Sequence, residues 1–207
     1  FETIRDLSRE IVNESDISKK HPEFDSKKRM ILKSIKVFTK YNNHSEAKKI
    51  TGPIDRFRIY IKDEDVFMKM MHVFESYKNK STIKDVIKCI DTVLLFTEDK
   101  EVLTKVVDAF TLYENLPLGA GLSNAIGNTA MHSKSKEETM RVTNLFFTKE
   151  IYDTIEAYKD HSLANRVSEA IGSIAQHINN IDAIIASTDS LFENQNNKYI
   201  SQIIDNT

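Results

Sequence analysis

The passage Lys105–His132, KVVDAFTLYENLPLGAGLSNAIGNTAMH, occurs a second time 45 positions later as Glu150–His177, EIYDTIEAYKDHSLANRVSEAIGSIAQH. Nine of the 28 aligned pairs are identical, far more than two unrelated segments of this composition share. Self-similarity at a fixed period of roughly 20–50 residues is typical of proteins built from stacked supersecondary units. The duplicated passage therefore predicts a repeat protein.

An aromatic pair of the form Phe-x-x-Tyr traces the repeat back towards the N-terminus. Successive copies are separated by 36, 36 and 45 residues. Residues three apart lie on one face of a helix, so we expect each pair to dock the end of a helix against its neighbours. The copies are Phe38/Tyr41, Phe74/Tyr77, Phe110/Tyr113 and Ile155/Tyr158, in which isoleucine replaces phenylalanine.

A short polar turn and a second apolar-periodic segment follow each of these tyrosines, which predicts a helical hairpin. One slot of the turn suits a helix start, because a serine oxygen there can accept hydrogen bonds from the free amides of the next helix and a proline fits the first turn. The slot holds Ser45, Ser81, Pro117 and Ser162.

Small residues inside the second helix have packing explanations. Cys89 falls in the slot of Ala125 and Ala170, so we interpret it as a small buried side chain and not as a nucleophile. Gly127 and Gly172 lie in the same helix, where glycine costs on the order of 1 kcal/mol relative to alanine. We expect a neighbouring helix to come too close there for a side chain.

Two places depart from the regular pattern. In the first copy, Thr51-Gly52-Pro53 occupies the second helix, so that helix should be short, broken or restarted at Pro53 and continued through Ile54, Phe57 and Tyr60. The 45-residue step predicts nine residues inserted near Ser133–Arg141, which with Val142–Phe147 would form an extra short helix.

The predicted organisation is a short N-terminal part followed by one continuous repeat domain. Residues 1–26 hold an amphipathic helix, Glu2–Ser15, and a polar connector, Asp16–Ser26. Residues 27–207 hold units at about 27–62, 63–97, 98–133, 134–178 and, as a partial copy, 179–207.

Composition limits the partners and the compartment. The 207 residues include 29 basic and 31 acidic side chains, a net charge of −2, so nucleic-acid binding would need a local basic patch. No apolar run approaches the roughly 18 residues of a membrane span. The single cysteine, which cannot form an internal disulfide, favours a reducing, cytoplasmic compartment. Because the sequence begins at Phe1 and not at methionine, we expect it to be trimmed, processed or a piece of a longer protein. Its oligomeric state is left open.

These hairpins resemble the HEAT and armadillo class of helical repeats. The resemblance rests on the 36- to 45-residue steps, on the pattern S-x-A-I-G-x-x-A in Ser123–Ala130 and Ser168–Ala175, and on a three-helix unit around Glu137–His177. It implies an all-α fold, a right-handed α-solenoid of about four to five hairpins with an extra N-terminal helix, and a scaffold that binds proteins. Armadillo importins use tryptophan and asparagine arrays, and this chain has no tryptophan.

The sequence contains no motif that predicts a catalytic, cofactor-binding or metal site. Gly119-Ala-Gly121-Leu-Ser-Asn124 begins like a dinucleotide-binding loop, but Asn124 replaces the third glycine and no strand precedes it. His132 and His177 match each other as helix-end residues, where a positive charge suits the helix dipole. A metal shared by these histidines is a remote alternative, because no cysteine or carboxylate column accompanies them.

Two surfaces of the first helices are candidate binding sites. Equivalent outward slots of stacked repeats form a ridge, and its later part is acidic, so we predict that it meets a basic partner surface. A basic stretch on the first repeat helix is the alternative. The ridge comprises Lys69, His72, Glu75, Lys105, Asp108, Glu150, Asp153 and Glu156, and the basic stretch comprises Lys27, Lys28, Arg29, Lys33, Lys36 and Lys40.

Three functions follow in order of preference. The first is a non-enzymatic scaffold or adaptor that binds a protein or peptide partner on stacked repeat helices. The second is nucleic-acid binding through the basic stretch, which is less favoured because the aromatic residues there occupy core slots. The third is an enzyme with a pocket between helices that the sequence does not reveal.

Overall fold

The computed structural model describes residues 9, 22–178, 180–197, 202 and 204. Its regular elements are all helices, and no strand occurs in these residues, which confirms the all-α prediction. The predicted N-terminal helix lies outside the described residues apart from Arg9. The helices are α2 (Pro22–Tyr41), α3 (Thr51–Tyr60), α4 (Glu64–Tyr77), α5 (Ile83–Thr97), α6 (Lys100–Leu112), α7 (Gly119–Ser133), α8 (Lys136–Leu145), α9 (Lys149–Tyr158), α10 (Ala164–His177) and α11 (Ile181–Glu193).

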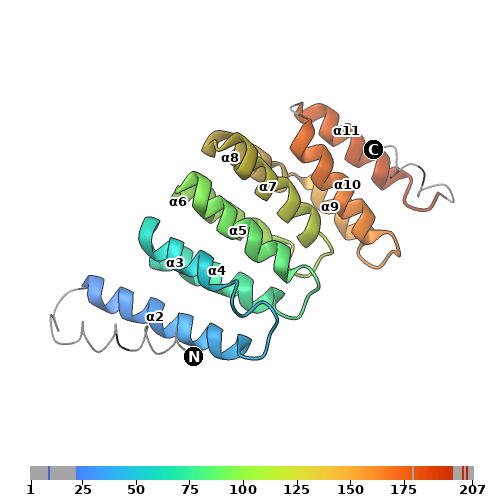
Figure 1. Ribbon diagram of the computed structural model, residues 1–207. Helices are drawn as coiled ribbons and strands as arrows, with labels where there is room; N and C mark the ends of the chain where they lie inside the picture. Colours follow the sequence, from blue (N-terminus) through green and yellow to red (C-terminus); the bar gives the residue numbers. More distant parts are fainter. Residues whose placement is uncertain (1–8, 10–21, 179, 198–201, 203, 205–207) are drawn as a thin grey trace.

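The helices form a row in which α2 and α11 lie at opposite ends (Figure 1). In a first layer, α2 packs against α4, α4 against α6 and α6 against α8. In a second layer, α3 packs against α5, α5 against α7 and α7 against α10. Because each helix contacts its counterpart in the next hairpin, equivalent sequence slots of neighbouring hairpins come to lie side by side.

A buried tyrosine links each hairpin to the next first-layer helix. Its hydroxyl donates to a carbonyl 33 residues onward, at the C-terminal end of that helix, where backbone carbonyls have no partner within the helix. The tyrosine is therefore both a core side chain and a helix cap, which confirms the predicted docking role of the aromatic pair. The bonds join Tyr41 to Phe74 (2.5 Å), Tyr77 to Phe110 (3.1 Å), Tyr113 to Phe146 (2.6 Å) and Tyr158 to Leu191 (2.7 Å).

The connections between hairpins also repeat with a period of 36. Lys62, Glu98 and Lys134 each have a positive φ. The next residue in each case caps a first-layer helix, and these caps are Asp63, Asp99 and Ser135. The regular series thus continues through α8 to Phe146, so the structure places the nine additional residues between Phe146 and Ile155 instead of near Ser133–Arg141.

The additional residues divide one first-layer helix into two. α8 packs against α6 and α7, whereas α9 packs against α10 and α11. Phe146, Phe147 and Thr148 lie at the break, with Phe146 buried. α8 therefore continues the preceding stack, and α9 begins the following one with a second copy of the aromatic pair.

The first repeat helix begins earlier than predicted, whereas the second helix of the first hairpin agrees with one of the predicted alternatives. α2 begins at Pro22, inside the predicted connector, because proline fits the first turn of a helix, where its missing N–H is not needed. α3 is short, as one of the alternatives predicted, and begins at Thr51, so Pro53 also lies in a first turn.

The predicted serine caps are wrong. The N-cap residues of α3, α5, α7 and α10 make no side-chain capping bond. Instead, the backbone amide three residues after each tyrosine donates to the tyrosine carbonyl at 2.8–3.0 Å. In two turns the Nδ1 atom of a histidine, His44 or His161, also accepts a backbone N–H at 3.1 Å.

The second layer contains a close approach of two helix backbones. A Cβ atom on Gly121 would lie 1.9 Å from the carbonyl oxygen of Ser168, and one on Gly172 would lie 2.5 Å from that of Gly121. The packing explanation is therefore confirmed for Gly172. It is wrong for Gly127, because a Cβ there would meet Cys89 of α5 at 3.5 Å, an ordinary contact.

Candidate functional site

The predicted ridge is largely engaged in contacts between first-layer helices. The Lys69 amine lies 2.7 Å from the Asp108 carboxylate, and His72 Nε2 lies 3.1 Å from Glu114. Glu75 binds two lysines of the preceding helix, Lys33 and Lys40, each at 3.0 Å. Burial raises the pKa of Glu75, but these two lysines outweigh it and hold the pKa below the usual value.

The remaining ridge residues do not join them in one acidic surface. The Lys105 amine lies 5.0 Å from the centre of the Phe147 ring. Glu150, Asp153 and Glu156 all lie on α9, beyond the break in the first layer. Asp153 pairs with Lys149 of the same helix, and Glu156 pairs with Lys159 just after it.

The predicted basic stretch is partly neutralised by the next first-layer helix. Arg29 binds Glu64 through two nitrogens, at 2.5 and 2.7 Å, and Lys33 and Lys40 bind Glu75. Lys28 and Lys36 are exposed, and Lys27 is half-buried. The stretch therefore helps to hold α2 against α4 and does not form an array of exposed cations.

A different surface feature lies on the second layer, and the sequence interpretation missed it. Ile59, Leu95 and Met131 occupy one slot near the C-terminal ends of α3, α5 and α7, separated by steps of 36. Their exposed fractions are 61%, 41% and 36%. We call these three residues the apolar strip. The sequence contains the strip as apolar residues that recur every 36 positions, the same step that separates the first three aromatic pairs.

A second series accompanies the apolar strip one residue onward. It consists of ring-bearing side chains, Tyr60, Phe96 and His132, of which Tyr60 and His132 are exposed and Phe96 is half-buried. The Lys134 amine lies 5.7 Å from the centre of the Phe96 ring. In α10 the corresponding slots hold Gln176 and His177, so the strip ends at α7.

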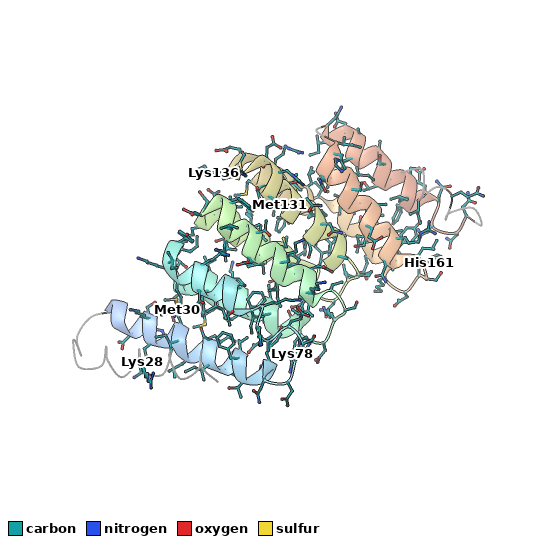
Figure 2. The ribbon with its side chains drawn as sticks, in the orientation of Figure 1. Lys28, Met30, Lys78, Met131, Lys136 and His161 are labelled. Carbon is teal, nitrogen blue, oxygen red and sulfur yellow. The ribbon has the colours of Figure 1, made fainter. Side chains whose placement is uncertain are left out.

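Two hollows border the apolar strip. One, of about 630 Å³, lies between α2 and α3 and is lined by Ile59 with Met30 and charged neighbours. The other is small, about 50 Å³, and lies between α5 and α7 beside Met131, which Figure 2 labels on α7. The strip therefore has recesses at both ends into which a bound side chain can reach.

The cysteine and the glycines that were considered as a nucleophile and as a dinucleotide-binding loop have structural roles. Cys89 is buried, which confirms its interpretation as a filler, and burial raises the pKa of its thiol. Gly119 and Gly121 begin α7, and Gly121 packs against α10. Among the described residues, no group of three His, Cys, Asp or Glu side chains is placed to hold a metal ion. Nor does any helix in that part of the chain have the length and apolar character needed to cross a membrane.

Comparisons with protein-family models, curated proteins and solved structures find no significant match.

Proposed function

We propose that the chain is a helical-repeat interaction module, a right-handed α-solenoid of the HEAT and armadillo kind, that binds a partner protein through the apolar strip. Stacked equivalent slots are the usual way in which such repeats build an extended binding surface. The proposed role is non-enzymatic, as a scaffold or adaptor.

The observation that carries this proposal is the recurrence of exposed apolar residues in one slot of three consecutive second-layer helices. Single exposed apolar side chains are ordinary on protein surfaces and need no explanation. A series in register is different, because Ile59, Leu95 and Met131 are exposed in equivalent slots of helices that pack side by side. An apolar line bordered by hollows suits the side chains of a protein partner.

The nucleic-acid alternative has less support. Arg29, Lys33 and Lys40 are paired with carboxylates of α4. The tyrosines of the aromatic pairs are buried and their hydroxyls donate to backbone carbonyls, so these rings are not presented as stacking platforms for bases.

Affinity capture with matched leucine variants tests the proposal. Leu95 in the strip and Leu112 at the end of α6 are 41% and 40% exposed, so Leu95→Glu and Leu112→Glu add the same charge at similar solvent exposure in different layers. Wild-type and variant chains would be used to capture proteins from the source cell, with quantification by mass spectrometry.

We expect Leu95→Glu to reduce capture of the specific partner by about tenfold or more, since a charge would be buried at an apolar contact. Leu112→Glu should capture it as the wild type does. Equal capture by both variants, with both folded by circular dichroism, would contradict a partner site on the strip.

A further inference from the structure

The hairpin turns lie along the edge of the stack marked by Lys78 and His161 in Figure 2, opposite Lys136. Between the first and second turns lies an open groove of about 500 Å³. Its lining includes His44 and Glu46 from the first turn and Lys78, Lys80 and Lys84 from the second turn and the start of α5. We call this feature the turn groove.

The three lysines of the turn groove are not engaged in ion pairs with any residue that the structure describes. Within the described part of the chain, none of their amines has a carboxylate within ion-pair distance, whereas Lys33, Lys69 and other first-layer lysines are paired. Glu46, the acidic residue of the groove, already binds Lys49 at 2.8 Å. Glu46 and Glu114 act on Lys84 and Lys80 from a longer distance, so the described residues of the turn groove include three lysines and only distant carboxylates.

Aromatic rings hold two of these lysines in place. The Lys80 amine lies 4.2 Å from the centre of the Tyr77 ring, and the Lys78 amine lies 5.8 Å from that of Tyr41. Such contacts orient an ammonium group without neutralising it. Burial lowers the pKa of Lys80, although the nearby charge of Glu114 acts in the opposite direction.

The repeat itself does not require these lysines. In the third hairpin, the slots of Lys78, Lys80 and Lys84 hold Glu114, Leu116 and Ala120. The tyrosine bond and the turn geometry are nevertheless the same in both hairpins. The basic set is therefore a property of one turn and needs an explanation other than folding.

We propose that the turn groove binds an acidic peptide segment, one that presents two or more closely spaced negative charges. Three lysines line one groove with no described carboxylate at ion-pair distance, and an anionic segment can accept hydrogen bonds from their ammonium groups. The site is separate from the apolar strip and does not depend on it.

A peptide fits the turn groove better than a nucleic acid. A nucleic acid would need a basic track that follows its phosphates and accessible rings for its bases. Glu114 interrupts the positive series at the next turn, and Tyr41 and Tyr77 are buried. A short acidic segment needs neither feature.

Grafting the residues of the third hairpin onto the second provides the test. The variant Lys78→Glu/Lys80→Leu/Lys84→Ala carries side chains that the same slots already accept. Binding would be measured by fluorescence anisotropy with a short synthetic glutamate-rich peptide, a matched peptide with glutamine in place of glutamate, a phosphoserine version and a single-stranded RNA. The control is Lys28→Glu, which changes an exposed lysine on α2, far from the turns (Figure 2).

We expect the wild type to bind the glutamate or phosphoserine peptide, the graft to lose at least about tenfold in affinity, and Lys28→Glu to stay within about twofold. Lys84→Ala alone should lose part of the affinity, and this single variant replaces the graft in the test if the graft does not fold. Three results would overturn the proposal: no binding of either acidic peptide, equal binding by wild type and graft, or binding of RNA alone, which would make the groove a nucleic-acid site.

Discussion

The two layers of the stack use their outward side chains differently. First-layer helices pair theirs from one helix to the next, as in Lys69 with Asp108 and His72 with Glu114. Second-layer helices form an ion pair between α3 and α5, Arg56 with Asp91 at 2.8 Å. At α7 and α10, however, they approach through small residues, as at Gly121 and Gly172, and the layer leaves Ile59, Leu95 and Met131 exposed in register. The first layer also exposes single apolar residues, such as Leu32 and Leu112. What distinguishes the second layer is that its exposed apolar residues recur in one slot of three neighbouring helices.

The largest expected effect breaks the close packing of the second layer. In Gly121→Ala, the added Cβ would overlap the carbonyl of Ser168, a backbone atom that cannot rotate away. α7 and α10 must then separate, and we expect a loss of about 3 kcal/mol or more in the free energy of unfolding, measured with urea.

Gly127→Ala is the matched control for that substitution. Its Cβ would meet Cys89 at an ordinary distance, so the gain in helix propensity, about 1 kcal/mol, should make it neutral or stabilising. Similar destabilisation by both alanines would refute the backbone-contact explanation.

Removing a tyrosine hydroxyl that caps a first-layer helix should cause a smaller loss of stability. Tyr113→Phe keeps the buried ring but leaves the Phe146 carbonyl, bound at 2.6 Å, without its donor. Unfolding free energy should fall by about 1–2 kcal/mol. Tyr77→Phe removes a longer bond, 3.1 Å, and should cost less. If neither substitution changes the midpoint of thermal unfolding, the tyrosine hydroxyls do not stabilise the stack.

The smallest effect concerns the ion pairs of the first layer. The pKa of Glu75 is lowered in the folded protein, so its ionised form stabilises the fold above the ordinary value of 4.5 and this contribution disappears as pH falls through the folded pKa. Glu75→Gln should therefore be less stable than the wild type near pH 7, on the order of 1 kcal/mol or less. The difference should shrink in strong acid, and a difference that grew as pH fell would show the opposite linkage.

The helical architecture was predictable because its signals are periodic. Phe-x-x-Tyr, the turn and the small residues of the second helix recur at fixed steps, and they reveal the hairpins and the burial of Cys89. The serine caps were not predictable, since backbone bonds to the tyrosine carbonyl close the turns instead. The break after Phe146 was not predictable, because α8 and α9 both correspond to one first-layer helix of the earlier hairpins. In a sequence alignment, this partial duplication has the same appearance as a nine-residue insertion.

The candidate surfaces were harder to predict for a physical reason. Ion pairs such as Arg29 with Glu64 join residues 35 positions apart, and whether two long side chains meet depends on rotamers that a sequence pattern does not specify. The ridge therefore resembled a free surface. The apolar strip was predictable in principle, because its 36-residue steps are as regular as those of the tyrosines, but apolar residues at helical spacing are first interpreted as core.

Oxidation of Met131 in the bound complex tests the central claim most directly. All six methionines lie in the described residues, and Met131 is exposed whereas the other five are buried or half-buried. Met131 should therefore react first with a mild oxidant. Peptide mass spectrometry would follow Met131 against the half-buried Met68 and Met140, with and without the partner captured by the wild-type chain. We predict that the partner slows oxidation of Met131 severalfold and leaves the other two unchanged. An unchanged rate at Met131 in a complex shown to be intact would contradict a partner site on the second layer.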